Sequence, residues 1–239
     1  EILNFSVKKG TKAIKLNYIN EPLIRNDFIK FIDYAKKIGI LDIYFSTNGI
    51  LLNKKTSTEL IKSGLTRIQI SIDAITKDTY DKVRPGGNYD KIIKNIEEFL
   101  SIKKDLNVQL PLVRVNFVKT SINRHELQKF LDFWNDKVDM IGVQEFVTPT
   151  KVENPSLAAR SKRKESFKCS FPFKQLVINN EKKILPCCTF WGEELELQTL
   201  KKPEDLLSAW NSRKMQKLRE KHLEGKYYEV EQCKKCIDG

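Results

Sequence analysis

Five cysteines, all after residue 168, are the side chains best suited to chemistry in this sequence. They are Cys169, Cys187, Cys188, Cys233 and Cys236. We expect no secretory signal, because residues 1–10 contain no continuous apolar segment, and therefore no disulfides. The close Cys233-x-x-Cys236 pair is typical of a metal site. Four thiolates suit tetrahedral zinc or an iron–sulfur cluster, and the spacing alone favours zinc.

Polar residues at the ends of predicted strands are a second candidate for chemistry. They are Asn20-Glu21-Pro22-Leu23, Ser46-Thr47-Asn48-Gly49, Ser71-Ile72-Asp73-Ala74, and Arg114 with Asn116. Taken singly, each group also fits a turn or a helix cap, because Asn-Gly and Glu-Pro are turn dipeptides and Asp73 is a suitable capping residue. Their position at the same end of successive strands favours one shared ligand site.

The elements that must position these residues alternate between strand and helix up to residue 146. Apolar patterning predicts strands over 13–18, 41–45, 67–72, 112–118 and 140–146, and helices over 28–39, 56–62, 88–103 and 125–134. This alternation indicates parallel βαβ units with right-handed crossovers. A barrel and an open doubly wound sheet are both compatible with it, and both bind ligands at the carboxyl ends of their strands.

The pattern changes after residue 146. Residues 147–168 carry two prolines and a charge run with little periodicity, which predicts a linker. Beyond the linker we predict a hairpin over 174–186 and a helix over 203–223 that begins at Pro203. The chain's two histidines, His125 and His222, lie on predicted helices among charged residues, and we predict surface positions for both.

The composition favours a folded protein with a basic surface. The 239 residues are 40% hydrophobic and carry a net charge of +12, which supports a core and argues against global disorder. No apolar run is long enough for a membrane-spanning helix. A solvated, lysine-rich surface explains the charge most simply, and an acidic or phosphorylated substrate or nucleic acid is the alternative. The densest basic stretch, 160–164, is interpreted as a solvated loop.

Four short segments together resemble the radical S-adenosylmethionine enzymes. In chain order they are NEPL at 20–23, STNG at 46–49, SIDA at 71–74 and YDKVRPGG at 80–87. NEPL resembles the GGEP segment that follows the second barrel strand of that family. Each segment is weak alone, but their order and spacing carry the resemblance. It implies an α/β fold over residues 1–146, a partial (β/α)6 TIM-like barrel lacking its first strand, with S-adenosyl-L-methionine as cofactor.

The resemblance also implies roles for individual residues. Glu21 is expected to accept hydrogen bonds from the α-amino group of the cofactor, because a fixed carboxylate suits an ammonium. Arg114 is expected to pair with the methionine carboxylate as a bidentate fork, and Arg84 is a second candidate for that role. The residues expected to face the ribose and methionine portions are Asn48, Ser71 and Asp73. No catalytic side chain is assigned.

One part of the family pattern is missing from the sequence. The family holds the [4Fe–4S] cluster that cleaves S-adenosylmethionine on a Cys-x-x-x-Cys-x-x-Cys loop, and this chain has no cysteine before Cys169. Residues 1–10 are interpreted as the tail of the helix after that loop. Either the chain is a piece of a longer protein, or it has lost the radical chemistry. We favour the first, because the pocket residues Glu21, Asp73 and Arg114 are retained together, and we expect the cluster in the full-length protein.

Residues 169–239 resemble the SPASM or twitch extension that carries an auxiliary cluster in many of these enzymes. Matching segments are Phe171-Pro172-Phe173, Ile184 to Cys188, and Leu206 to Ser212. The resemblance turns the preference from zinc to an auxiliary [4Fe–4S] cluster, and it implies Cys169, Cys187, Cys233 and Cys236 as the ligands. Cys188 is left over and is interpreted as a small buried side chain. Lys182 stands where the family usually has glycine. A second cluster would need cysteines beyond Cys236, so the number of auxiliary clusters stays open.

The function implied by the resemblance is that of a radical S-adenosylmethionine oxidoreductase or maturase. A 5′-deoxyadenosyl radical would abstract hydrogen from a small-molecule or peptide substrate, and the basic surface favours a sugar-like or nucleotide-linked one. An electron donor such as flavodoxin or ferredoxin is the expected partner, in the cytoplasm, with no membrane or nucleic-acid partner. The alternatives are a peptide-modifying maturase and a non-catalytic, zinc-stabilised binding module.

Overall fold

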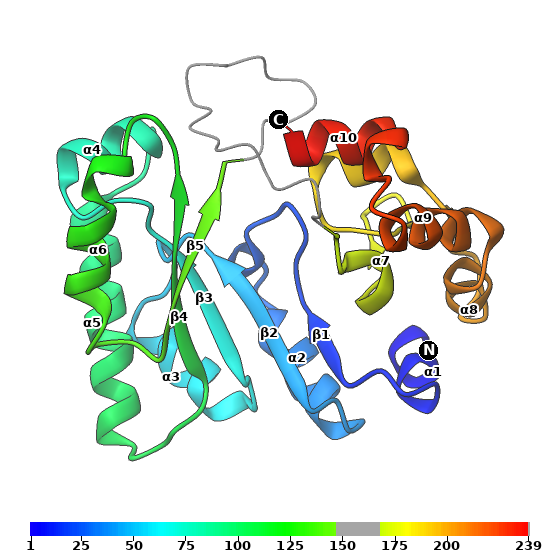
Figure 1. Ribbon diagram of the computed structural model, residues 1–239. Helices are drawn as coiled ribbons and strands as arrows, with labels where there is room; N and C mark the ends of the chain where they lie inside the picture. Colours follow the sequence, from blue (N-terminus) through cyan, green and yellow to red (C-terminus); the bar gives the residue numbers. More distant parts are fainter. Residues whose placement is uncertain (147–167, 239) are drawn as a thin grey trace. The chain divides into compact units, whose positions relative to one another are not determined.

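The computed structural model describes residues 1–146 and 168–238. They form two compact units (Figure 1), one of residues 10–145 and the other of residues 1–9 with the chain from Phe146 onward. The predicted linker lies outside the described residues except for Lys168, as does the basic stretch 160–164. The predicted domain limits, 1–146 and 169–239, stay a prediction. Within the described residues, no helix combines the length and apolar character needed to cross a lipid bilayer.

The larger unit is built on a sheet of five parallel strands in the order β1-β2-β3-β4-β5. The strands are β1 (Ala13–Lys15), β2 (Asp42–Thr47), β3 (Arg67–Ser71), β4 (Leu112–Lys119) and β5 (Met140–Glu145). The connections contain η1 (Pro22–Ile24), α2 (Phe28–Lys37), α3 (Lys54–Ser63), α4 (Lys77–Val83), α5 (Tyr89–Asp105), η2 (Arg124–Glu126) and α6 (Leu127–Trp134). The parallel order with helical crossovers confirms the predicted α/β partial barrel.

Local sequence signals explain where two of these helices begin and where one ends. The Asn53 side chain accepts the Thr56 N–H at the start of α3, and Asn88 accepts the Lys91 N–H at the start of α5. Helix α3 ends at Gly64, whose φ of 102° is in the left-handed region. Helix α3 packs between α2 and α5.

The two faces of the sheet differ in polarity. On β3, Ile68 and Ile70 are fully buried, whereas Arg67, Gln69 and Ser71 on the opposite face are half-buried. Strand side chains alternate between faces, so one face carries the hydrophobic core of this unit and the other is polar. The polar face, called the inner face below, carries several of the predicted site residues.

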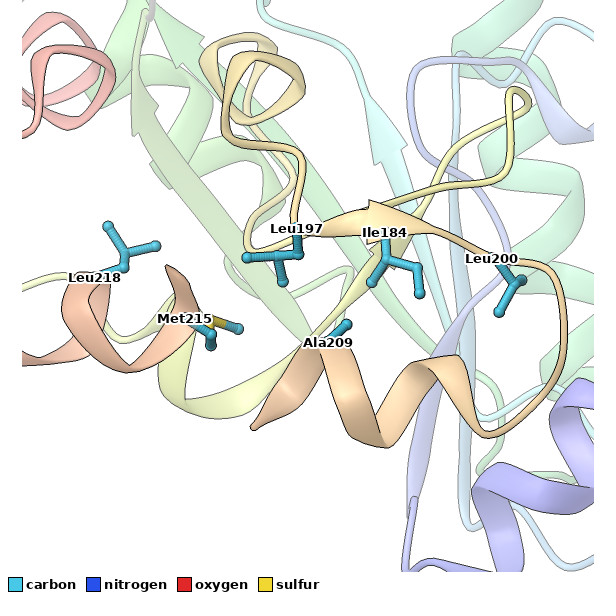
Figure 2. Packing of buried hydrophobic residues seen from close by; sticks show 6 residues of the cluster. All are labelled: Ile184, Leu197, Leu200, Ala209, Met215 and Leu218. Carbon is cyan, nitrogen blue, oxygen red and sulfur yellow. The ribbon is translucent and has the colours of Figure 1, made fainter. Parts of the chain in front are cut away.

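The smaller unit is an α+β arrangement around a three-stranded antiparallel sheet. It contains α1 (Ile2–Lys8), α7 (Phe171–Lys174), β6 (Val177–Ile178), β7 (Lys183–Leu185), η4 (Phe190–Leu195), β8 (Gln198–Thr199), α8 (Asp205–Trp210), α9 (Arg213–Leu223), η5 (Tyr227–Glu229) and α10 (Glu231–Asp238). Its core is a cluster of apolar side chains from β7, α8, α9 and the loops beside β8 (Figure 2), namely Ile184, Leu197, Leu200, Ala209, Met215 and Leu218. Ile2 of α1 packs against this cluster.

One prediction for this part of the chain needs correction. The predicted single helix over 203–223 is two helices, because Ser212 leaves the helical conformation and accepts the Met215 N–H as the N-cap of α9. The pair Cys233 and Cys236 lies on helix α10. Residues 1–9 include a helix, α1, which belongs to the same compact unit as the C-terminal part of the chain.

Candidate functional site

Glu21 stands at the carboxyl end of β1 and is held by three hydrogen bonds. Its Oε1 accepts from the Leu23 N–H at 3.2 Å and from the Thr47 hydroxyl at 2.9 Å, and its Oε2 accepts from the Asn48 N–H at 2.7 Å. The prediction that Glu21 and the STNG segment share a site is therefore consistent with direct contact between them. An ionised carboxylate offers about four acceptor positions, so one position remains for a ligand.

The turn that contains Asn48 is fixed by a residue that the sequence reasoning did not single out. Buried Asn95 of α5 donates its side-chain N–H groups to the carbonyls of Gly49 and Ile50, at 2.8 and 3.2 Å. The Asn48 side chain accepts the Ile50 N–H at 2.9 Å. The sequence could have indicated this contact, because Asn95 lies on the apolar face of its helix and a buried side-chain amide needs hydrogen-bond partners.

Asp73 is buried at the carboxyl end of β3 with both carboxylate oxygens engaged. Oδ1 accepts the Val118 N–H at 2.7 Å, while Oδ2 accepts from Arg84 Nε at 2.8 Å and lies 2.6 Å from Arg84 Nη2. Its carbonyl accepts from the Asn123 amide at 2.8 Å. Arg84, the second candidate for a partner of the cofactor carboxylate, is thus paired with Asp73 of the protein itself. These contacts give Asp73 a positioning part, and its contact with the cofactor stays a prediction.

Glu126, which the sequence reasoning did not single out, supports the segment that follows SIDA. Its carboxylate accepts from the N–H groups of Ile75 and Thr76 and from the hydroxyls of Thr76 and Thr79. Burial opposes ionisation of Glu126, but the hydrogen bonds outweigh it and lower its pKa. Glu126 thus holds the start of α4 as a charged group.

Arg114 and Asn116 place polar atoms on the inner face beside Ser71. Ser71, Asn116 and Gly142 are adjacent in strand register on β3, β4 and β5. A Cβ at Gly142 would lie 2.0 Å from Arg114 Nη2, so only glycine leaves room for the guanidinium there. Within the described residues, buried Arg114 Nε and Asn116 Oδ1 have no hydrogen-bond partner.

The four predicted ligand cysteines come from three parts of the smaller unit, with Cys169 before α7, Cys187 after β7, and Cys233 and Cys236 together on α10. Burial, with the thiols of Cys187, Cys169 and Cys236 nearby, raises the pKa of Cys233 to about 12. Burial also raises the pKa of Cys187, against the hydrogen bond to Thr189. None of the five cysteines forms a disulfide. A bound metal would remove these protons, since thiolates are the ligands that zinc and iron–sulfur clusters use.

The surroundings of the cysteines are compatible with a bound cluster. A Cβ at Gly192 would lie 2.7 Å from Cys187 Sγ, so glycine permits η4 to approach that sulfur closely. Among the described residues, no three Cys, His, Asp or Glu side chains are near enough to share one metal ion directly. The prediction that Cys188 is buried is wrong, because it is exposed. An exposed thiol next to Cys187 stays outside the predicted ligand set.

His222 contradicts the prediction of a surface position. It is 1% exposed, and its Nε2 lies 3.4 Å from Cys233 Sγ. Burial lowers the pKa of His222. The sequence could have indicated this burial. His222 follows the buried residues Met215 and Leu218 of α9 at helical spacing, and positions three and four apart share a helix face. The same prediction for His125 is confirmed, since that residue is exposed.

Comparison with known families gives two matches that together cover most of the chain. Residues 1–132 match the family model described as the radical SAM superfamily. Residues 169–237 match the SPASM model, described as an iron–sulfur cluster-binding domain. The second match begins at Cys169 and includes all five cysteines.

Curated relatives match about half to two thirds of the chain. The protein named "Probable GTP 3′,8-cyclase" from Methanocaldococcus jannaschii is 34% identical over 152 residues, which are 64% of this chain and 48% of that protein. A protein of the same name from Saccharolobus solfataricus is 34% identical over 125 residues, 52% of this chain and 38% of that protein. The matched region therefore spans about half or less of the length of these relatives.

Solved structures share the fold at low sequence identity. Streptococcus suis SuiB aligns with a TM-score of 0.71 at 16% identity, over 92% of this chain and 60% of its own. The anSMEcpe structure with bound AdoMet aligns with a TM-score of 0.66 at 10% identity, over 100% of this chain and 78% of its own. At these identities the likeness supports the fold alone.

Proposed function

Because this chain belongs to the radical S-adenosylmethionine superfamily, we propose that the complete protein is a hydrogen-abstracting enzyme of that superfamily. Bound S-adenosylmethionine with a reduced [4Fe–4S] cluster supplies a 5′-deoxyadenosyl radical that takes the hydrogen. The chain has no cysteine before Cys169, so in this proposal residues other than 1–239 hold that cluster. The part played by this chain is to bind and orient the cofactor and the substrate.

The proposal is carried by the two buried polar atoms without partners on the inner face. Arg114 Nε and Asn116 Oδ1 lie two residues apart on β4 and have no hydrogen-bond partner among the described residues. Leaving such a group unsatisfied costs about 1–3 kcal/mol. A ligand that offers both an anionic acceptor and a donor offsets this cost, and an amino acid moiety with a ribose has both.

Each predicted pocket residue receives a role that its contacts allow. Glu21 has one acceptor position left, which suits an ammonium donor. Arg114 pairs with a carboxylate, and Gly142 on β5 leaves the space that the Arg114 guanidinium occupies. Asn48 and Ser71 offer polar atoms to the ribose at the ends of β2 and β3. Asp73 fixes the loop between β3 and α4 through Arg84 and Val118.

The proposed substrate class is a nucleotide or a nucleotide-linked sugar. The support is the 34% identity to a protein named for a GTP cyclase and the net charge of +12, which attracts phosphorylated ligands. On the half-buried inner face, Gln69 and Arg114 offer polar groups to such a ligand. The alternative that the test must distinguish from this class is a peptide substrate, as in a peptide-modifying maturase.

In the C-terminal unit, we propose that Cys169, Cys187, Cys233 and Cys236 hold an auxiliary [4Fe–4S] cluster. Its proposed role is to accept an electron from the substrate or to bind it. A cytoplasmic location and an electron donor such as flavodoxin or ferredoxin fit the reduced thiols that a cluster requires.

The test uses the protein produced from its complete coding sequence, purified and reconstituted without oxygen. With S-adenosylmethionine and dithionite we expect 5′-deoxyadenosine, measured by chromatography, and we expect GTP to increase its formation. The same amount of product with and without GTP, together with an increase from a peptide, would overturn the nucleotide class. No 5′-deoxyadenosine at all would overturn the radical function.

A binding measurement tests Arg114 independently of turnover. Arg114→Met is expected to weaken S-adenosylmethionine binding about thirtyfold or more in calorimetry, because truncating one partner of a buried charge pair costs at least about 2 kcal/mol. The matched control is Arg124→Met, since Arg124 is exposed and its loss should leave the affinity unchanged. Equal affinity of the two variants would remove Arg114 from the site.

A further inference from the structure

His222 is a buried histidine that the proposed function does not use. It lies in the last turn of α9 and is 1% exposed. It contacts two of the four cysteines in the proposed ligand set, which are distant from each other in the sequence. Its Nδ1 is 3.4 Å from the backbone nitrogen of Cys169, and its Nε2 is 3.4 Å from Cys233 Sγ.

These two contacts determine which ring nitrogen carries the proton. The Cys169 N–H is a donor, so Nδ1 must be the acceptor and carry no hydrogen. The single proton of a neutral imidazole is then on Nε2, which points at the Cys233 sulfur. The geometry therefore makes the ring an N–H donor to the sulfur of one ligand and an acceptor for the backbone of another.

The helix that carries His222 is packed into the smaller unit. Met215 and Leu218 on the same helix belong to the apolar cluster of the smaller unit (Figure 2). Lys168 donates to the Leu223 carbonyl at 2.6 Å, so the segment leading into Cys169 is also attached to the end of α9. A packed helix positions a side chain more accurately than a loop does.

We propose that His222 is a positioning residue of the auxiliary cluster, joining the Cys169 backbone to the Cys233 sulfur and donating an N–H···S hydrogen bond to it. The inference rests on the ligand set proposed above. Hydrogen bonds to cluster sulfurs are one of the factors that set reduction potentials. The reduced cluster is more negative, so an N–H donor stabilises it and raises the potential. Partners outside the ligand shell also typically contribute about 10- to 100-fold to metal affinity.

Variants of this 239-residue chain test the proposal. The chain has no cysteine before Cys169, so any cluster that it binds through cysteines is held by the smaller unit. His222→Leu fills the space without polar atoms, and we expect a more negative midpoint potential and about 10- to 100-fold weaker retention of iron against a chelator. His222→Gln keeps one donor and one acceptor and should lie between His222→Leu and the unchanged chain. The matched control, His125→Leu at an exposed site, should behave as the unchanged chain does.

A second measurement needs no substitution and applies even if His222→Leu does not fold. The chain has only two histidines, so ¹⁵N-histidine labelling reports almost solely on His222. Pulsed electron paramagnetic resonance of the reduced cluster should show a weakly coupled nitrogen and an exchangeable deuteron in D2O. A strongly coupled nitrogen would make His222 a ligand and overturn the positioning role.

The remaining outcomes separate this inference from the proposed ligand set. A cluster with no histidine coupling, and with the same potential in His222→Leu as in the unchanged chain, would overturn the inference and leave the cysteine ligands standing. An unchanged chain that binds no iron would overturn the ligand set and the inference together.

Discussion

The carboxyl end of the parallel sheet and the cysteine site of the smaller unit differ in what holds their polar groups. At the sheet, Glu21 and Glu126 each accept several hydrogen bonds from backbone and hydroxyl groups, and Asp73 accepts from the Val118 N–H and the Arg84 guanidinium. At the cysteine site, Cys233 and Cys187 are half-buried thiols whose pKa values are raised by partial burial, and neighbouring thiols add to that rise. One site is formed by bonds within the protein, and the other brings together groups that disfavour one another's ionisation.

This difference teaches which unit depends on its cofactor. The loops after β1, β2 and β3 are held by hydrogen bonds that need no ligand, so the proposed pocket is ordered without one. Thiolates held together gain their compensation only from a metal centre, and in such sites binding energy becomes folding energy. We therefore expect loss of the cluster to affect the smaller unit and to leave the sheet intact.

The largest expected effect follows from removing one proposed ligand. In Cys233→Ser, hydrogen exchange of backbone amides in β7 and α9 should accelerate by about a hundredfold or more, because cluster binding stabilises that unit. Amides in β3 and β4 should exchange as before. Cys188→Ser is the matched control, since Cys188 is exposed. Equal acceleration in both units would contradict the comparison.

A smaller effect is expected where the sheet is held by charge. Asp73→Asn keeps an acceptor for the Val118 N–H and tolerates the positive φ of 63° at this position, but it loses the charged partner of Arg84. We expect the free energy of unfolding, measured in urea, to fall by about 1.5–3 kcal/mol. Asp81→Asn on α4, where the side chain is half exposed, should change it little. A null result at Asp73 would mean that the ion pair is not stabilising.

Glu126 gives the larger unit a distinct dependence on pH. Its pKa in the folded state is below the ordinary value of 4.5, so its stabilising contribution is complete above about pH 4.5. That contribution is lost as the pH falls through the lowered pKa. Glu126→Gln should remove this part of the acid sensitivity, seen as a flatter dependence of the urea midpoint on pH between neutral and acid solution. An unchanged slope would contradict the ionised capping role.

The smallest effect is expected at Lys182, which adopts a φ of 62° in the turn between β6 and β7. L-residues are disfavoured in this conformation by about 1–2 kcal/mol and glycine is not, which gives a physical reason for the glycine usual in the related pattern. Lys182→Gly should therefore raise the stability of the smaller unit by up to about 1 kcal/mol in thermal unfolding. Lys183→Gly, within β7, should lower it.

The sequence was most informative where local patterns decide the structure. Alternation in Arg67 to Ser71 and helical spacing in Ile92, Ile96 and Phe99 predicted a strand and a helix that the structure contains. The polar segments at strand ends followed from the rule that parallel strands share a carboxyl edge. By contrast, the break at Ser212 was missed, because the apolar spacing continues through it and only the capping contact to Met215 separates α8 from α9.

The parts that were missed depend on contacts between distant residues. Asn95 supports the turn at Gly49, and Glu126 supports the segment after Asp73 through Ile75 and Thr76. The residues next to Asn95 and Glu126 in the sequence do not indicate which distant residues they bond. His222 was misplaced for a related reason, because its charged neighbours suggested a surface position although its own helix face is buried.

The central claim is that Cys169, Cys187, Cys233 and Cys236 together hold a [4Fe–4S] cluster. The most direct test is the iron, acid-labile sulfide and zinc content of the 239-residue chain after anaerobic reconstitution, beside the Cys233→Ser variant. We predict about four iron and four sulfide ions per chain, and their loss in the variant. One zinc ion per chain with no sulfide, or iron retained in full by Cys233→Ser, would contradict the claim.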